Sequence, residues 1–210
     1  AGYSASNLRD SACPGAVSGR TPRRTQDFRL LFRLLYGTGV RLGEALRFTI
    51  DDIDLAAGTL LIRKGKNGRE RLLPLSVGLL ERLSTHLGEF PGPRQAPLFA
   101  SKYGPVMRKE TVDFAFREFL LPQTSLPPRK SGKGPRVHDL RHTFAVHRLE
   151  NWFRAGEDIE AKLPYLAAYM GHSCIISTYD YLRLTVSFFP EITRRLTAGL
   201  GDIIPKGGDA

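Results

Sequence analysis

The spacing of apolar residues changes twice along this chain, and the change limits the folds it can adopt. Near the start, Phe28, Leu31, Phe32 and Leu35 recur at the intervals of one helix face. Residues 51–75 instead hold short apolar runs separated by glycines, which is typical of strands joined by turns. Helical spacing returns from about residue 77. The sequence therefore predicts an α+β fold that is mainly α-helical, with a small three-stranded antiparallel sheet.

The predicted elements occupy most of the chain. Helices are expected at about 26–36, 41–48, 77–87, 111–120, 138–153, 159–170, 177–184 and 190–200. Strands are expected at about 51–55, 59–64 and 70–75, and Pro74 ends the last strand or places it at an edge. Residues 1–25 lack periodicity and are predicted to be a flexible lead-in or a truncated linker, and residues 201–210 a tail. Residues 26–200 are thus expected to form one domain.

Charge and composition indicate the class of partner. The chain has 31 Lys and Arg against 21 Asp and Glu, a net charge of +10, which favours a polyanion such as nucleic acid. Two cysteines argue against a disulfide framework and for a reducing compartment. No apolar run approaches a membrane span and no signal peptide is recognised, so a cytoplasmic location is expected. The basic residues of two predicted loops are candidates for nucleic-acid contacts: Lys64, Arg69, Arg129, Lys130, Lys133 and Arg136.

A helix start at residues 137–145 carries the first chemical signal. His138 and Arg141 are three residues apart, so they share one helix face, where a proton-transfer group and a guanidinium suit a phosphate. A metal site formed by His138, His142 and His147 is the competing interpretation. It lacks the His-Glu-x-x-His arrangement, because Asp139 is followed by a leucine. Chemistry without a metal or other cofactor is therefore favoured.

Several further motifs stand in a recognisable order around this helix start. They are 35–46 (LYGTGVRLGEAL), Lys66 in the turn before 71–75 (RLLPL), 138–144 (HDLRHTF), 170–172 (MGH) and 179–182 (YDYL). With these motifs, residues 26–200 resemble the catalytic domain of the tyrosine recombinases, the phage-integrase and Xer-type family. Members of that family usually carry an N-terminal helical domain, for which residues 1–25 are too short. The resemblance therefore implies a catalytic fragment or a naturally reduced member.

The resemblance implies a role for each matching residue. Arg41 and Arg141 correspond to the two arginines that bind the scissile phosphate. Glu44 would orient Arg41, although an ordinary surface pair at this spacing explains it equally well. Lys66 corresponds to the general acid that protonates the leaving oxygen, with Lys64 as the alternative.

The remaining roles fall on histidines and a tyrosine. His138 would bind the phosphate or accept the proton of the nucleophile, and His172 would donate to the phosphate. The family places its tyrosine nine residues after the second histidine, which selects Tyr181, with Tyr179 as the rival. The two phenols would point about 200° apart on one helix, so only one can face the phosphate.

The implied reaction is cleavage and rejoining of DNA through a covalent 3′-phosphotyrosine, for site-specific recombination or mobile-element integration. The implied partners are double-stranded DNA and further protomers in a tetramer, and the implied location is cytoplasmic and nucleoid-associated. A C-terminal helix at 188–200 would dock on a neighbouring protomer or pack on its own domain. The alternatives are relaxation of DNA by a type IB topoisomerase-like enzyme and a non-catalytic DNA-binding accessory protein.

Overall fold

The computed structural model describes residues 22–63, 70–101, 106–126, 134–172, 178 and 181. Two compact units are distinguished, residues 1–144 and residues 145–210, and the boundary falls within one helix. The described elements are mainly helices, with one three-stranded sheet in the first unit. The predicted fold class is therefore confirmed. Among the described residues, no helix is long and apolar enough to cross a membrane.

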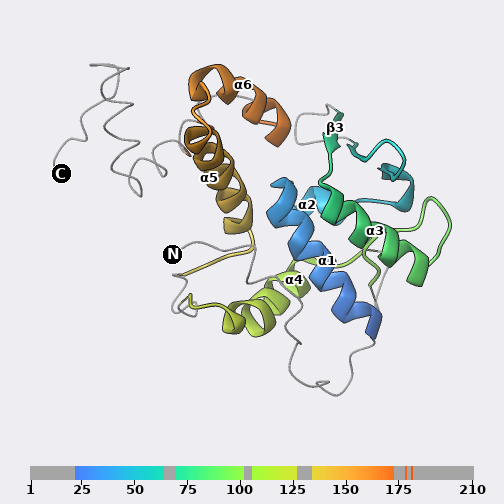
Figure 1. Ribbon diagram of the computed structural model, residues 1–210. Helices are drawn as coiled ribbons and strands as arrows, with labels where there is room; N and C mark the ends of the chain where they lie inside the picture. The colour runs from blue at the N-terminus through green and yellow to red at the C-terminus, as the bar shows by residue number, and fades with distance from the viewer. Residues whose placement is uncertain are drawn as a thin grey trace. The chain divides into compact units, whose positions relative to one another are not determined.

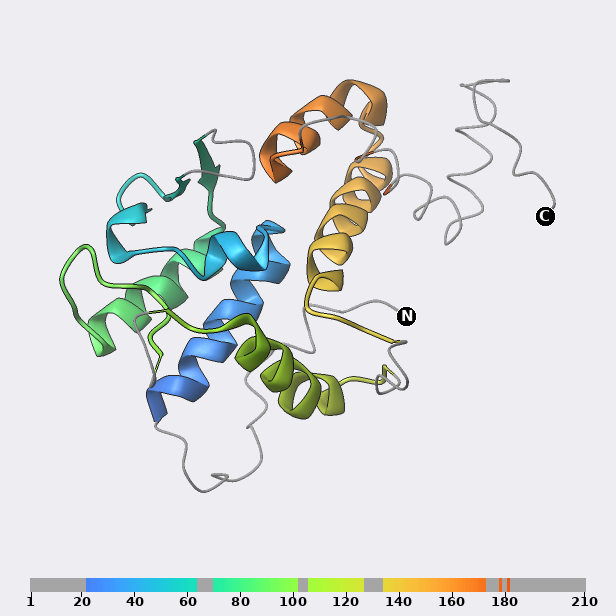
Figure 2. The ribbon, with the colours of Figure 1, turned by 180° about the vertical axis from the view of Figure 1, so that it is seen from behind.

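Two helices form the centre of the first unit. Helix α1 (Pro22–Thr38) and helix α3 (Val77–Glu89) lie side by side (Figure 1 and Figure 2). Along α1, Leu31 and Leu34 are fully buried, as is Leu83 on α3. The apolar stripe predicted for the first helix is thus the core-facing side of α1. The helix begins four residues before the predicted start at 26, within a polar turn that shows no stripe.

Helix α2 (Leu42–Ala45) and the sheet follow α1. Strands β1 (Ile53–Asp54), β2 (Thr59–Ile62) and β3 (Arg71–Pro74) pair antiparallel in the order β1-β2-β3. Leu60 pairs with Leu73 at the buried centre of the sheet, and Pro74 lies on an edge strand, as its missing N–H requires. The three predicted strands are confirmed in number and direction.

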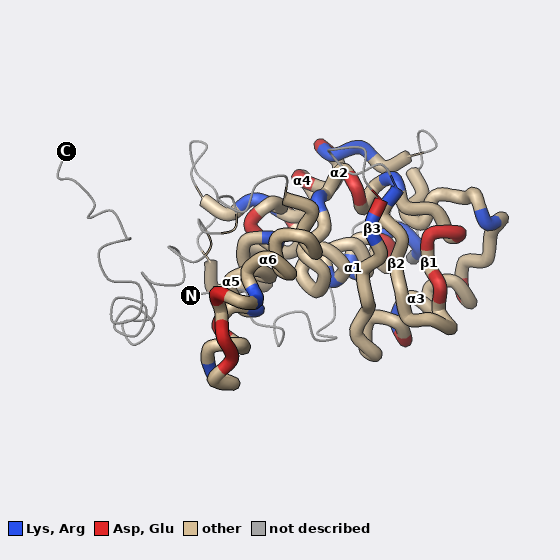
Figure 3. The backbone as a smooth tube through the Cα atoms, turned by 90° about the horizontal axis from the view of Figure 1, so that it is seen from above, with Lys and Arg blue, Asp and Glu red and all other residues tan. Residues whose placement is uncertain are grey.

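The segment before β1 differs from its prediction. Ile50–Asp52 form a 3-10 helix (η2), so the strand expected at 51–55 begins only at Ile53. The reason is local, because one Asp52 oxygen accepts hydrogen bonds from the Thr49 N–H at 2.8 Å and the Thr49 hydroxyl at 2.9 Å. Asp51 and Asp52 both form ion pairs with Arg63, and Asp51 also pairs with Arg94. The acidic stretch at β1 is coloured red in Figure 3.

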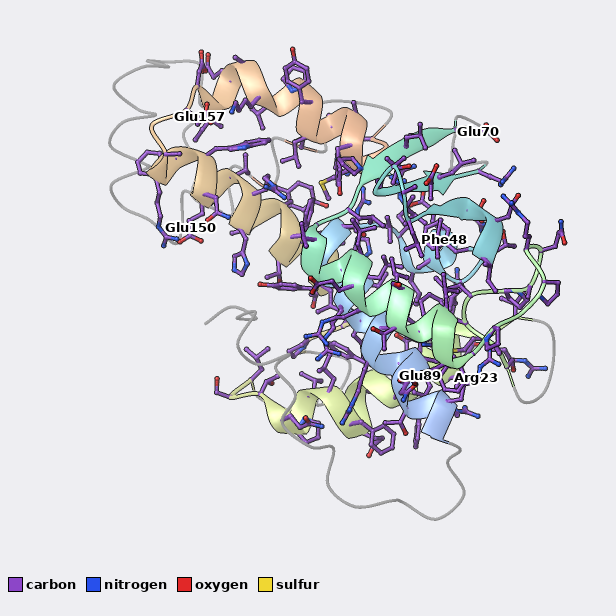
Figure 4. The ribbon with its side chains drawn as sticks, turned by 45° about the vertical axis from the view of Figure 1, so that its right-hand side comes forward. Arg23, Phe48, Glu70, Glu89, Glu150 and Glu157 are labelled. Atoms are coloured by element: carbon purple, nitrogen blue, oxygen red, sulfur yellow. The ribbon has the colours of Figure 1, made fainter. Side chains whose placement is uncertain are left out.

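Irregular chain and short helices complete the first unit. Phe48 is buried in its interior (Figure 4), and its carbonyl accepts a hydrogen bond from Leu98 N–H at 2.8 Å. Helix α4 (Lys109–Ala115) continues as the π-helix η3 (Phe116–Leu120) and the 3-10 helix η4 (Leu121–Gln123). The edge of the Phe116 ring packs against Phe32 of α1, with ring centres 5.9 Å apart.

The second unit contains most of one described helix and the whole of another. Helix α5 (Asp139–Arg154) contains the boundary between the units, and helix α6 (Ile159–Met170) has the predicted bounds. Their connection holds Glu157, labelled in Figure 4, which pairs with Lys162 of α6 at 2.7 Å. The Lys162 ammonium also lies 5.6 Å from the centre of the Trp152 ring on α5. The helices predicted at 177–184 and 190–200 lie outside the described residues, apart from Thr178 and Tyr181.

Candidate active site

The turn after α1 sets the position of Arg41. Gly39 ends the helix with φ of 63°, and its N–H donates to the Leu35 carbonyl at 2.9 Å. The Thr38 hydroxyl donates to the Leu34 carbonyl at 2.6 Å, which satisfies a second carbonyl at the helix end. A β-carbon at position 39 would lie 2.4 Å from Cδ1 of Phe144. Only glycine fits here, and the fixed turn carries the chain to Arg41 two residues later.

Glu44 holds Arg41 from one helical turn away. The Arg41 backbone N–H donates to Oε2 of Glu44 at 3.1 Å, and Nη1 of Arg41 donates to Oε1 at 3.2 Å. The Glu44 side chain is only 3% exposed. This carboxylate is therefore a buried anchor for Arg41, which goes beyond the surface pair that the sequence left as an alternative.

Arg71, at the start of β3, is a second partner of Glu44. Its Nη2 lies 2.8 Å from Oε2 and its Nη1 lies 3.3 Å from Oε1 of that carboxylate. Arg71 was not among the site residues predicted from the sequence. A usable signal was present, because Arg71 is two positions from the buried Leu73 and so faces the same side of the strand. A charged residue on the buried face of a strand requires a partner.

The electrostatics of Glu44 follow from this arrangement. Burial opposes ionisation and raises the pKa of the Glu44 carboxyl. The hydrogen bond from Arg71, the hydrogen bond from the Arg41 backbone and the charges of both guanidiniums act in the opposite direction. Their combined effect exceeds that of burial, so the pKa of Glu44 is lowered and the group carries its negative charge at neutral pH.

Helix α5 brings the second arginine to the same turn. Asp139, in the first turn of α5, accepts the N–H of the preceding Arg136 at 2.8 Å. Two residues on, Nη1 of Arg141 donates to the Gly39 carbonyl oxygen at 2.6 Å, and Arg141 is only 2% exposed. Arg41 and Arg141, far apart in the sequence, are thus both fixed by residues 39–44. Two fixed guanidiniums can bind the oxygens of one phosphate.

His138 and His142 lie edge to face at the start of α5, with ring centres 4.7 Å apart. Partial burial, the neighbouring His142 and the charge of Arg141 lower the pKa of His138. Burial also lowers the pKa of His142. Both imidazoles therefore favour the neutral form at pH 7, in which one ring nitrogen accepts a proton. Within the described segments, no group of three His, Cys, Asp or Glu side chains is arranged to hold a metal ion.

A second group of candidate residues lies in the second unit. Helix α6 ends at Gly171, whose φ of 68° is left-handed, and His172 N–H donates back to the Ala167 carbonyl at 2.9 Å. Nδ1 of His172 lies 2.8 Å from the hydroxyl oxygen of Thr178, which is fully buried. The ring of Tyr181 stacks on His172 with centres 5.8 Å apart and planes 13° apart. Tyr181 is 5% exposed.

Thr178 was not predicted as the partner of His172. Among the other residues predicted from the sequence, Arg136 is exposed just before α5. The remaining ones lie outside the described residues: Lys64, Lys66, Arg69, Arg129, Lys130, Lys133 and Tyr179. For these residues the roles implied by the resemblance stay predictions.

Comparisons with known proteins agree with the family resemblance. The model of the phage integrase family matches residues 20–187. The putative integrase/recombinase y4rE of Sinorhizobium fredii is 32% identical over 183 residues, covering 85% of this chain and 58% of that protein. Tyrosine recombinase XerC of Chromobacterium violaceum is 33% identical over 179 residues, covering 84% of this chain and 54% of that protein. The chain therefore spans a little over half the length of these relatives.

Solved structures show the same fold. A crystal structure of XerA recombinase superposes with a TM-score of 0.64 at 19% identity, covering 97% of this chain and 64% of that one. XerH site-specific recombinase, bound to its difH substrate in a pre-cleavage complex, superposes with a TM-score of 0.58 at 22% identity. That match covers 78% of this chain and 44% of the XerH chain.

Proposed function

Since the chain belongs to the phage integrase family, we propose that it cuts and rejoins DNA strands through a covalent 3′-phosphotyrosine. The reaction serves site-specific recombination or the integration of a mobile element. Relatives of the chain are named integrases and tyrosine recombinases, and the chain covers a little over half of their length. The proposal therefore extends their chemistry to this part of the protein.

The observation that carries the proposal is the fixing of two arginines at one turn. Arg141 donates to the Gly39 carbonyl, and Arg41 follows that glycine by two residues and is held by Glu44. A phosphodiester gains negative charge on its non-bridging oxygens as the nucleophile attacks. Guanidiniums that are already oriented stabilise that charge without further reorganisation.

The nucleophile is assigned to Tyr181. A phenol has a pKa near 10, so it needs assistance at neutral pH. The stacking of Tyr181 on His172, and the hydrogen bond of His172 with Thr178, support placing Tyr181 within the same site as this histidine. Because Tyr181 is buried without DNA, its oxygen has to become accessible to the phosphate when DNA binds.

The proposed cleavage step exchanges one phosphorus–oxygen bond for another. The Tyr181 oxygen forms a bond to the scissile phosphorus while the bond from phosphorus to the 5′-oxygen breaks. The phenol proton goes to His138, whose lowered pKa keeps the imidazole neutral and therefore able to accept a proton. Lys66 gives a proton to the departing 5′-oxygen, and His172 donates to a phosphate oxygen. Attack by a 5′-hydroxyl of another strand reverses these steps and rejoins the DNA.

The test is a nicked suicide DNA that traps the covalent adduct, followed by denaturing electrophoresis. The native chain should form an adduct and Tyr181→Phe should not, while Tyr179→Phe serves as the matched control and should retain it. An adduct that survives in Tyr181→Phe but is lost in Tyr179→Phe would reverse the assignment. Exchange between two synthetic sites, compared with relaxation of a supercoiled plasmid, separates a recombinase from a topoisomerase.

The proposed partners are double-stranded DNA and further protomers assembled as a tetramer on it. A lambda integrase of similar fold has been solved as a tetramer on a Holliday junction. DNA contacts are assigned to Lys64, Arg69, Arg129, Lys130, Lys133 and Arg136, which predicts affinity that falls steeply with salt. Phe188, Phe189, Ile192 and Leu196 give residues 188–200 apolar anchors for a neighbouring protomer. Deleting residues 187–210 should then reduce assembly on DNA more than thermal stability.

A further inference from the structure

Arg71 is the more closely bound of the two arginines that share Glu44. Its two terminal nitrogens lie 2.8 and 3.3 Å from the two carboxylate oxygens, whereas the Arg41 guanidinium reaches the carboxylate through Nη1 at 3.2 Å. The Arg71 side chain is 14% exposed and that of Arg41 is 25% exposed. Arg71 contacts both carboxylate oxygens with one planar guanidinium, which fixes the plane of the carboxylate. The Arg41 backbone N–H also binds Oε2, at 3.1 Å.

The backbone of Arg71 is itself well supported. Arg71 opens β3 directly after Glu70, which is labelled in Figure 4, and it pairs in register with Ile62 of β2. Ile62 is fully buried, and Leu73, on the same face as Arg71, is 1% exposed. The guanidinium that orients Glu44 is therefore mounted on the core side of a sheet, a firmer support than a loop.

We propose that Arg71 is a positioning residue, which holds the Glu44 carboxylate in the orientation that directs Arg41 toward the scissile phosphate. The inference rests on the proposed function, because it assigns Arg71 an effect on the same reaction. Arg71 acts through Glu44 and Arg41, and contact with the DNA is not part of its role. Its loss should therefore slow the chemical step and leave the affinity for DNA nearly unchanged.

The expected size of the effect follows from geometry. Displacement of a catalytic group by about 1 Å can slow a reaction on the order of 100-fold. Arg71→Gln should thus slow single-turnover cleavage at saturating DNA by about 10- to 100-fold. Arg71→Lys keeps the charge without the planar fork, so it should recover little of the rate. Arg63→Gln removes an exposed arginine that directly follows β2 and pairs with Asp51 and Asp52, and this control should cleave normally.

The experiment measures adduct formation on the nicked substrate under single-turnover conditions, DNA affinity and melting temperature for each variant. Together with Arg71→Gln, the variants Glu44→Gln and Glu44→Gln/Arg71→Gln form a double-mutant cycle. If Arg71 acts through Glu44, the double variant should be about as slow as Glu44→Gln alone. A normal rate at saturating DNA for Arg71→Gln would overturn the proposal. In that case, weaker DNA affinity would indicate that Arg71 contacts DNA directly. A lower melting temperature with unchanged affinity would indicate a purely structural role.

The positioning role and the reaction can fail separately. If the native chain forms no adduct, the proposed function fails, and the nitrogen NMR signals of the Arg41 guanidinium then decide the positioning role. The native protein should show restricted rotation of that guanidinium, and Arg71→Gln should restore free rotation. Unchanged Arg41 signals in Arg71→Gln would overturn the inference. If Arg71→Gln does not fold, Arg71→Lys is measured in its place, and unchanged Arg41 signals there would overturn the inference in the same way.

Discussion

Nη1 of Arg141 donates a 2.6 Å hydrogen bond to the carbonyl oxygen of Gly39, a residue 102 positions earlier in the chain. The contact joins the start of α5 to the end of α1. The backbone of the motif at 35–46 therefore supports a side chain of the motif at 138–144. Changes at either residue should therefore affect both stability and chemistry.

Replacing Gly39 with alanine should be strongly destabilising. The residue has φ of 63°, and a β-carbon would lie 2.4 Å from the Phe144 ring. Left-handed strain and overpacking together should reduce the free energy of unfolding by about 3 kcal/mol. Gly37→Ala is the matched control, because its β-carbon would meet only Leu79, at 3.9 Å. Chemical denaturation should show that control unchanged or slightly more stable, and equal losses in both variants would contradict the argument.

Arg141→Lys should reduce cleavage more than it reduces DNA affinity. A lysine cannot reproduce the planar fork, so the contact with Gly39 and the phosphate cannot both be kept. Loss of the buried hydrogen bond should lower the free energy of unfolding by about 1 kcal/mol. Single-turnover adduct formation and filter binding measure the two effects. Arg148→Lys, at an exposed position of the same helix, is the control and should behave as the native chain.

Glu44→Gln should change how stability depends on pH. The lowered pKa of Glu44 means that its ionisation stabilises the fold above the ordinary value near 4.5, and this contribution is lost as the pH falls through the folded pKa. At pH 7 the variant should be less stable by about 3 kcal/mol, because two arginines lose their buried partner. The difference in melting temperature should shrink below pH 4.5. A difference that stays constant down to pH 3 would argue against the assigned ionisation, and Glu81→Gln controls for loss of one exposed carboxylate.

Lys66→Ala should lose cleavage on ordinary DNA and recover it on DNA with a bridging 5′-sulfur. A thiolate leaves without a proton, so the general acid becomes dispensable. Lys64→Ala, at the alternative position, should be impaired only slightly on both substrates. Equal impairment of Lys66→Ala on both substrates would show that Lys66 binds phosphate and does not supply the proton.

Cleavage should persist when divalent metals are removed with EDTA. Stabilisation of the negative charge on the phosphate is assigned to arginines, whose positive charge does not depend on a metal. Adduct formation with EDTA and with added magnesium should therefore be similar. Complete loss in EDTA, restored by zinc or magnesium, would favour the competing metal site of His138, His142 and His147.

The sequence was a good guide where one helix face is uniformly apolar. The stripe beginning at Phe28 identified α1, and α6 was predicted with its observed bounds because Gly171 provides a helix stop that is visible in the sequence. The strand predicted at 51–55 was wrong at its start because of side-chain capping. Asp52 binds Thr49 and turns Ile50–Asp52 into a 3-10 helix, a local contact that outweighs strand propensity.

The candidate site was predictable only as far as local motifs reach. The contact of Glu44 with Arg41 spans three residues and could be suggested from spacing. Its contact with Arg71 spans 27 residues and depends on how β3 approaches α2, which no local pattern encodes. The same holds for the Gly39 carbonyl as the acceptor for Arg141.

The pairing of the buried Glu44 carboxylate with Arg41 and Arg71 also affects which state of the phosphate the proposed site would suit. Formally, Glu44 offsets one of the two charges of Arg41 and Arg71, and Arg141 at the Gly39 carbonyl adds another, so two positive charges are available. An unreacted phosphodiester carries one negative charge, which neutralises only one of these two positive charges. After attack by an ionised phenol, the phosphoryl group carries two negative charges, which neutralise both. In the proposed reaction, Glu44 would thus weaken the hold of the arginines on unreacted DNA and favour the short-lived dianion, as selective binding of a transition state requires.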